Sequence, residues 1–215
     1  MLLAGIPYSC RTSWREVIEA NDQDDDLLRR SAKGDEQAFS LLYGRHRAPI
    51  YRFAVRMTGS TWAAEEILQD VFMILLREPK RFDAARGSLA AYLYGIARNR
   101  VMKHFERLPR ELQMPEQGEN GVATLPSVVD QRTPAYWAEL QERRQQVRSA
   151  VLGLPVEFRE VVVLCELEEL SYEEAARVLQ CPVGTIRSRL HRGRALLLAK
   201  LEILRGAPKR ASATR

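Results

Sequence analysis

Basic and hydroxyl side chains gather in one segment near the C-terminal end, residues 183–197. They are Thr185, Arg187, Ser188, Arg189, His191 and Arg192. Cations and hydroxyl groups are the side chains that bind phosphates, so these types favour a polyanionic ligand. Ile186, Leu190, Gly193 and Leu197 recur among them every three or four residues. That spacing predicts a helix with one packing side and one side for the polyanion.

The segment before this helix predicts a partner for it. Ser171 followed three residues later by Glu174 matches a capping box, which begins a helix. Pro182 ends the helical pattern, because proline lacks an N–H and restricts the residue before it. Two helices joined by such a turn predict a helix-turn-helix, whose second helix enters the DNA major groove. An ordinary helical hairpin with a solvated basic face is the alternative.

A second candidate surface is the predicted helix over residues 89–107, which Ser88 can cap. Aromatic, cationic and amide side chains line the rest of this helix beside an apolar inward face; they are Tyr92, Tyr94, Arg98, Asn99, Arg100, Lys103 and Arg107. Single-stranded nucleic acid binds such mixtures, since a ring stacks on a base and a cation neutralises a phosphate. The alternative is that the aromatic rings belong to the core.

The helix predicted over residues 61–77 is amphipathic and acidic. Glu66 and Asp70 lie four residues apart and are therefore neighbours on one face, where like charges repel by a few tenths of a kcal/mol. A basic partner would offset that repulsion. A solvated acidic helix start, favoured by the helix dipole, explains the same residues equally well.

Catalytic patterns are missing from the sequence. His46, His104 and His191 share no metal-ligand spacing, and the chain has neither a glycine-rich phosphate loop nor a nucleophile elbow. We therefore expect no enzyme activity, no metal, no cofactor and no small-molecule substrate.

The three cysteines, Cys10, Cys165 and Cys181, lack CxxC spacing and leave one residue unpaired in any disulfide scheme. Together with the absence of a secretory signal, this favours a reducing cytoplasm. No apolar run approaches the ~20 residues of a membrane span.

The periodicity predicts an all-α protein of two small helical domains, in 215 residues of net charge +5. Proline and glycine residues interrupt the pattern between the halves and predict a flexible linker. Pro49 is expected to open a helix. The expected boundaries are an N-terminal tail over 1–23, a first domain over 24–108, a linker over 109–134, a second domain over 135–204 and a C-terminal tail over 205–215.

Two stretches together resemble the extracytoplasmic-function (ECF) sigma factors of bacterial RNA polymerase. LSYEEAARVLQCPVGTIRSRLHRGRALL is similar to their region four, and AAEEILQDVFMILLREPKRFD with GSLAAYLYGIARNRVMKHFER is similar to their region two. The resemblance spans residues 24–107 and 136–201. It implies an alternative sigma factor that binds core RNA polymerase and directs promoter recognition and opening.

The resemblance also implies roles for individual residues. Region two binds the polymerase clamp through Glu66, Gln69 and Asp70. The loop over residues 82–88 and the helix after it receive the single-stranded −10 element, with Phe82, Arg86, Tyr92, Tyr94, Arg98, Asn99 and Lys103 as the candidates. Region four reads the duplex −35 element through Thr185, Arg187, Ser188, His191 and Arg192, while Arg189 and Arg194 hold phosphates.

Family members are usually held inactive by an anti-sigma factor, so such a partner is expected here. The competing hypothesis is a helix-turn-helix transcriptional regulator that is not a polymerase subunit. Its N-terminal half would sense a ligand or receive a phosphate, but residues 24–107 show no βα alternation that would suit such a sensor.

Overall fold

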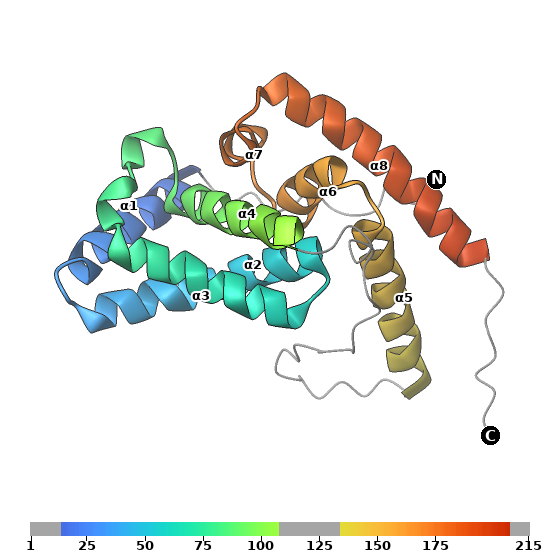
Figure 1. The fold of residues 1–215 in the computed structure, drawn as a ribbon, viewed down its shortest axis with the longest axis horizontal. Coiled ribbons are helices and arrows are strands. Elements are labelled where there is room, and N and C mark those ends of the chain that lie inside the picture. The colour runs from blue at the N-terminus through green and yellow to red at the C-terminus, as the bar shows by residue number, and fades with distance from the viewer. Residues whose placement is uncertain (1–13, 108–133, 207–215) are drawn as a thin grey trace.

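The computed structural model describes residues 14–107 and 134–206, and every regular element in these ranges is helical (Figure 1). The all-α expectation is confirmed. The N-terminal half contains α1 (Trp14–Ser31), α2 (Glu36–Thr58), α3 (Thr61–Arg77), the 3₁₀ turns η1 (Pro79–Arg81) and η2 (Ala84–Arg86), and α4 (Leu89–Arg107). The C-terminal half contains α5 (Pro134–Leu152), α6 (Val156–Val162), the π-helical turn η4 (Val163–Leu167), α7 (Tyr172–Leu179) and α8 (Val183–Gly206).

Helices α2, α3 and α4 pack around a common apolar core. Phe53, Met57, Leu75 and Leu93 are fully buried in it. A tight corner joins α2 to α3: Gly59 adopts a left-handed conformation (φ 76°), and the Ser60 side chain accepts a hydrogen bond from the Ala63 amide (3.2 Å). Local capping thus fixes where these helices begin and end.

Three boundaries differ from the expectation, one of them at the C-terminal end, where α8 runs to Gly206 and so enters the range 205–215 expected to be a tail. Pro49 lies inside α2 and opens no new helix. An interior proline costs about 3 kcal/mol, and burial of Ile50 and Phe53 on the same helix outweighs that cost. In addition, α1 begins at Trp14, within the range 1–23 expected to be a tail, and the helical spacing of Trp14, Val17 and Ile18 accounts for the difference.

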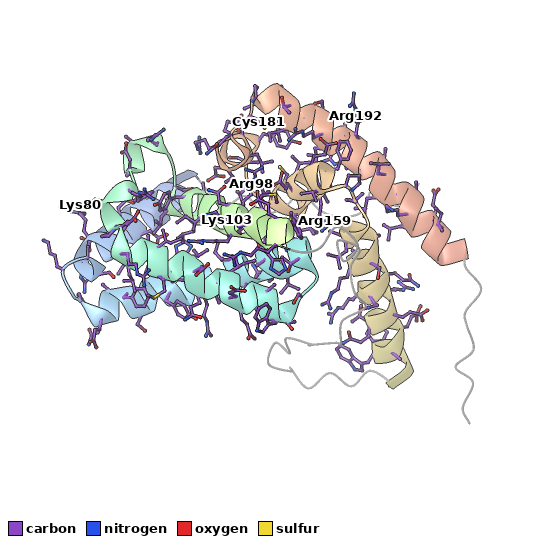
Figure 2. The ribbon with its side chains drawn as sticks, in the orientation of Figure 1. Lys80, Arg98, Lys103, Arg159, Cys181 and Arg192 are labelled. Carbon is purple, nitrogen blue, oxygen red and sulfur yellow. The ribbon has the colours of Figure 1, made fainter. Side chains whose placement is uncertain are left out.

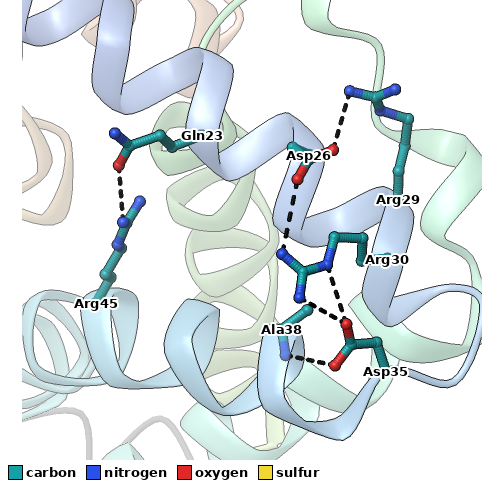
Figure 3. A network of polar contacts seen from close by, with 7 residues as sticks. All are labelled: Gln23, Asp26, Arg29, Arg30, Asp35, Ala38 and Arg45. Carbon is teal, nitrogen blue, oxygen red and sulfur yellow. Dashed lines mark hydrogen bonds and ion pairs between the residues drawn. The ribbon is translucent and has the colours of Figure 1, made fainter.

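Polar contacts connect α1 to α2 (Figure 3). Arg30 donates to the Asp35 carboxylate (2.8 Å), which also caps α2 by accepting from the Ala38 amide (3.0 Å). Asp24 is buried between the two helices and pairs with His46 (2.7 Å) and Arg45 (2.8 Å). Burial alone would raise the pKa of Asp24, but its bonds to His46 and Arg45 outweigh burial and hold the pKa below its usual value.

Helix α8 lies close against α6 because residue 193 is a glycine. A Cβ atom there would lie 2.9 Å from Cγ2 of Val162 and 3.4 Å from the Phe158 carbonyl oxygen. Ile186 and Leu190 are buried on the same side of α8. The small residue therefore sets the position of the helix that the sequence predicts to meet DNA.

The two halves share one apolar core. Its buried residues run from Leu27 and Leu28 in α1 to Ala175 in α7 and Ile186 in α8. Figure 1 shows α6 and α7 beside α4. The predicted flexible linker lies outside the described residues, except for Pro134, which begins α5. The two halves are therefore packed on one another in this structure.

We predict that Gly193→Ala lowers the free energy of unfolding. Crowding in a packed core costs about 1–3 kcal/mol, which exceeds the roughly 1 kcal/mol gained in helix propensity. Gly184→Ala is the control on the same helix, since a Cβ there would meet no heavy atom within 4 Å. Urea unfolding measures both variants. Equal or greater stability of Gly193→Ala would contradict the packing argument.

The lowered pKa of Asp24 generates a second prediction. A carboxyl group whose pKa is lower in the folded than in the unfolded chain stabilises the fold at pH values above its unfolded pKa, which is 3.8 for Asp24. This stabilisation is lost as the pH falls through the pKa of the folded chain. The difference in unfolding free energy between the native chain and Asp24→Asn should therefore shrink as the pH falls from about 5 to below 3.8. Asp26→Asn, an exposed change on the same helix, serves as the control. A difference that stays constant with pH would contradict the prediction.

Candidate nucleic-acid interface

The predicted helix-turn-helix is present in α7 and α8. Ser171 and Glu174 form the capping box: the Glu174 amide donates to Ser171 Oγ (3.2 Å) and the Ser171 amide donates to Glu174 Oε2 (3.1 Å). Gln180 ends α7 in a left-handed conformation (φ 52°). The Pro182 carbonyl then accepts from the Thr185 amide (2.9 Å) in the first turn of α8.

The outer side of α8 presents the predicted polar residues to solvent. Arg187, Ser188, His191 and Arg192 are exposed, whereas Ile186 of the same helix is fully buried. Figure 2 shows Arg192 on the side of α8 that faces away from the rest of the molecule. Within the described residues, no hydrogen bond or ion pair engages Arg187 or Arg192. Their guanidinium groups are therefore available to an external anion.

The remaining candidates on α8 already have intramolecular contacts. Arg194 donates to Glu166 of η4 (Nε to Oε1, 3.0 Å), and Arg189 lies 3.9 Å from Glu157 of α6. Thr185 is half-buried, and its carbonyl accepts from Ser188 Oγ (3.0 Å). The contacts of Arg189 and Arg194 hold α8 against α6 and η4.

The loop between α3 and α4 brings the Phe82 ring against Tyr92 of α4. The ring centroids of Phe82 and Tyr92 lie 5.6 Å apart, and Arg86 of the same loop is exposed. Burial raises the pKa of the Tyr92 phenol, which is therefore neutral. As predicted, Ser88 caps α4 by accepting from the Ala91 amide (3.3 Å).

Helix α4 divides its predicted DNA-binding residues between two sides. Tyr92, Asn99 and Lys103 are separated by seven and four residues and share one stripe, where Asn99 and Lys103 are exposed. Tyr94 and Arg98 lie on another side, against the C-terminal half. Tyr94 is buried beside Phe53, with its ring centroid 5.5 Å away.

Two carboxylates from the C-terminal half engage this second side of α4. The Tyr94 hydroxyl donates to Glu168 Oε2 (3.1 Å), and Arg98 Nε donates to Glu160 Oε1 (2.6 Å). Figure 2 shows Arg98 where α4 meets the C-terminal half. Neither Tyr94 nor Arg98 is free to bind a nucleotide in this arrangement.

Sequence reasoning missed the cations that share Glu168. Arg56 donates to Glu168 Oε1 and to the Leu167 carbonyl (3.0 Å), and Arg52 lies 3.4 Å from Glu168 Oε2. The Glu168 side chain is only 1% exposed, and burial raises its pKa although Arg56 and Arg52 lower it. The available signal was Glu168 itself, a charged residue that comes shortly after the apolar run over residues 161–165. The sequence offers no means to identify the partners of Glu168.

The acidic side of α3 borders the C-terminal part of α4. Glu66 and Gln69 are exposed, and Asp70 lies 3.4 Å from Arg100 of α4. A shallow polar notch is lined by Glu66, Ile67, Asp70, Arg100, Lys103, His104 and Arg107. Its acids and bases alternate, so a charged protein surface could bind there.

The described residues contain no cluster of His, Cys, Asp and Glu side chains that could hold a metal ion. Burial raises the pKa of the Cys165 thiol to about 11, which makes it a poor nucleophile. In the same ranges, no helix is both long and apolar enough to span a membrane.

Comparison with known proteins supports both halves of the interpretation. The sigma-70 region 2 family matches residues 42–111, and the sigma-70 region 4 family matches residues 144–197. The RNA polymerase sigma-H factor of Pseudomonas aeruginosa is 32% identical over 178 residues, which are 80% of this chain and 91% of that protein. The ECF RNA polymerase sigma-E factor of Haemophilus influenzae is 32% identical over 188 residues, 84% of this chain and 96% of that protein.

Solved structures with the same arrangement of helices include two complexes. CnrH in complex with the cytosolic domain of CnrY has a TM-score of 0.63 and 25% identity, covering 85% of this chain and 99% of CnrH. The sigma factor RpoE in complex with the anti-sigma factor NepR from Bartonella quintana has a TM-score of 0.58 and 25% identity, covering 77% of this chain and 97% of that chain.

A match to region 2 in the N-terminal half excludes the hypothesis of a regulator whose first half is a sensor domain. Sigma factors have no catalytic activity of their own and give RNA polymerase its choice of promoter. With both regions present and relatives aligned over most of its length, the chain belongs to the extracytoplasmic-function sigma factors and acts as an alternative sigma factor in transcription initiation.

Proposed function

We propose that three surfaces of this sigma factor divide the work of initiation. The outer side of α8 reads the duplex −35 element, the 82–88 loop with the exposed stripe of α4 binds the single-stranded −10 element, and the acidic side of α3 binds core polymerase. The observation that supports this division most strongly is the pair of exposed arginines on α8, Arg187 and Arg192, which have no partner among the described residues.

On the −35 element, Arg187 and Arg192 are suited to guanine. A guanidinium bound bidentately to the O6 and N7 edge discriminates against a wrong base by about 1–3 kcal/mol. Ser188 and His191 share the exposed face and are further base contacts. Arg189 and Arg194, which lie beside carboxylates of α6 and η4, bind phosphates and fix the register of α8 on the duplex.

On the −10 element, unpairing and flipping a base costs a few kcal/mol. The Phe82 and Tyr92 rings supply an apolar face for the flipped base, and Arg86 supplies a cation beside it. Asn99 and Lys103 continue the same path along α4 toward its C-terminal end, where the displaced strand would run. Tyr94 and Arg98 join this surface only after the C-terminal half moves away from α4.

Two further assignments follow from the relatives. Because CnrH was solved with CnrY, and RpoE with the anti-sigma factor NepR, an anti-sigma factor is the expected inhibitor of this chain as well. The second assignment is that this sigma factor acts in the cytoplasm, where core polymerase and promoter DNA are found.

Arg192→Ala should reduce transcription from a cognate promoter about 5- to 150-fold, as expected from losing 1–3 kcal/mol of base recognition. Affinity for core polymerase should remain unchanged. Run-off transcription on a promoter found by transcript mapping in overproducing cells measures the effect. Lys200→Ala, two turns further along α8, is the control. An equal loss in both variants would reject a specific role for Arg192.

Glu66→Lys should weaken binding to core polymerase at least about tenfold, because it replaces attraction to a basic clamp by repulsion. Binding of the isolated chain to −35 duplex DNA should not fall. Glu65→Lys on the adjacent side of α3 is the control, and fluorescence anisotropy with labelled chain measures both variants. Unchanged core affinity in Glu66→Lys would argue against this surface as the polymerase site.

A further inference from the structure

We propose that Arg52, Arg56 and Arg98 form a phosphate-binding row for promoter DNA, and that Glu160 and Glu168 cover this row in the closed arrangement. The row extends the proposed −10 surface and rests on the proposed function in one respect, namely that α4 binds DNA. Arg52 and Arg56 are additional to every DNA contact considered above. The ligand is the phosphodiester backbone, so the row binds without regard to sequence.

The three arginines lie on two helices of the N-terminal half that Glu168 bridges. Arg52 and Arg56 lie one turn apart on α2, and Tyr94 and Arg98 lie one turn apart on α4. Glu168 joins the two helices, since it contacts Arg52, Arg56 and Tyr94 together.

All of their carboxylate partners come from the other half of the chain. Glu160 belongs to α6 and Glu168 follows η4, and their side chains are 4% and 1% exposed. Each arginine retains access to solvent at its outer edge, with exposed side-chain fractions of 49% for Arg52, 31% for Arg56 and 24% for Arg98. The carboxylates therefore bind the inner side of the arginine row, which belongs to the N-terminal half.

These carboxylates occupy positions that phosphates could occupy. Both groups are anions that accept charge-assisted hydrogen bonds from guanidinium, and arginine is suited to both. When the C-terminal half moves away, the three arginines lose their partners and are left as unpaired cations. A polyanion is then the ligand that best replaces the lost bonds.

The closed arrangement depends on these buried ion pairs. Removing one partner of such a pair is strongly destabilising, so loss of Glu160 or Glu168 as a partner favours opening. The other polar contacts between the halves are single bonds, such as Ser88 Oγ to Glu174 (3.0 Å) and Arg159 to the Met57 carbonyl. Exchange of the carboxylates for DNA phosphates thus couples opening to DNA binding.

The test uses the full chain without polymerase and a fluorescein-labelled oligothymidine of about 20 nucleotides, long enough to span a binding groove. Glu160→Gln/Glu168→Gln removes both covering charges while preserving side-chain shape. Loss of these buried pairs should shift the closed-to-open equilibrium by at least about tenfold and raise the affinity for the oligonucleotide accordingly. Small-angle X-ray scattering should show a larger radius of gyration.

The number of new phosphate contacts is obtained from the way the affinity for the oligonucleotide falls with salt concentration. Each cation that binds single-stranded DNA adds about 0.7 to the slope of log affinity against log salt, so exposing three arginines should steepen the slope by about 2. Adding Arg52→Gln/Arg56→Gln to the opened variant should reverse about 1.4 of that change. Glu169→Gln/Glu173→Gln, an equal charge change at two exposed positions of the same half, should change neither the slope nor the radius.

A larger radius with an unchanged slope would overturn the phosphate-binding row, because the arginines would then be exposed without binding DNA. An unchanged radius and slope would overturn the covering role of the carboxylates. If circular dichroism shows that the double variant is unfolded, Glu168→Gln alone replaces it, with an expected slope increase of about 1.4 from Arg52 and Arg56. Since neither polymerase nor a promoter is present, failure here leaves the results for Arg192 and Glu66 intact.

Discussion

A buried carboxylate is the interaction on which the arrangement of this sigma factor depends. An isolated charge removed from water costs several kcal/mol, so Glu168 can be buried only if cations and donors surround it. Arg52, Arg56 and Tyr94 provide them, and all three belong to the other half of the chain. The requirement to satisfy one charge therefore joins segments that lie more than a hundred residues apart in the sequence.

This constraint affects the DNA-binding surfaces unequally. The outer side of α8 points away from the contact between the halves and keeps Arg187 and Arg192 exposed. The far side of α4 lies within the contact, so Tyr94 and Arg98 are occupied by Glu168 and Glu160. In this arrangement the proposed −35 surface is available, whereas only part of the proposed −10 surface is.

Close packing supports the same arrangement. Gly193 lets α8 approach α6, and Gly59 allows the corner after α2 to lie against Leu152 of α5, where a Cβ would be 3.1 Å from Leu152 Cδ1. A larger residue at either place would push elements apart that carry functional side chains. The family likeness to CnrH over 85% of this chain extends across both halves, so it includes the elements that make this contact.

The sequence by itself determined the helical class, the limits of α3, α4 and α7, the start of α8 and the outward side of α8. These features depend on contacts within a few residues: capping by Ser60, Ser88 and Ser171, and apolar spacing along one helix. It also determined the family, because the region-two and region-four motifs are continuous stretches of sequence. The core-polymerase and promoter roles of individual residues remain predictions.

Only the tertiary structure decided which side of α4 is free, which acids pair with Arg52 and Arg98, and that Pro49 remains inside α2. In a sequence, Tyr92 and Tyr94 look alike, since both are aromatic and lie on one helix. Tyr94 is buried and Tyr92 is only half-buried, because a segment more than sixty residues away packs on the Tyr94 side of that helix and not on the Tyr92 side. Local spacing defines a face, but only contact between distant elements decides which face is covered.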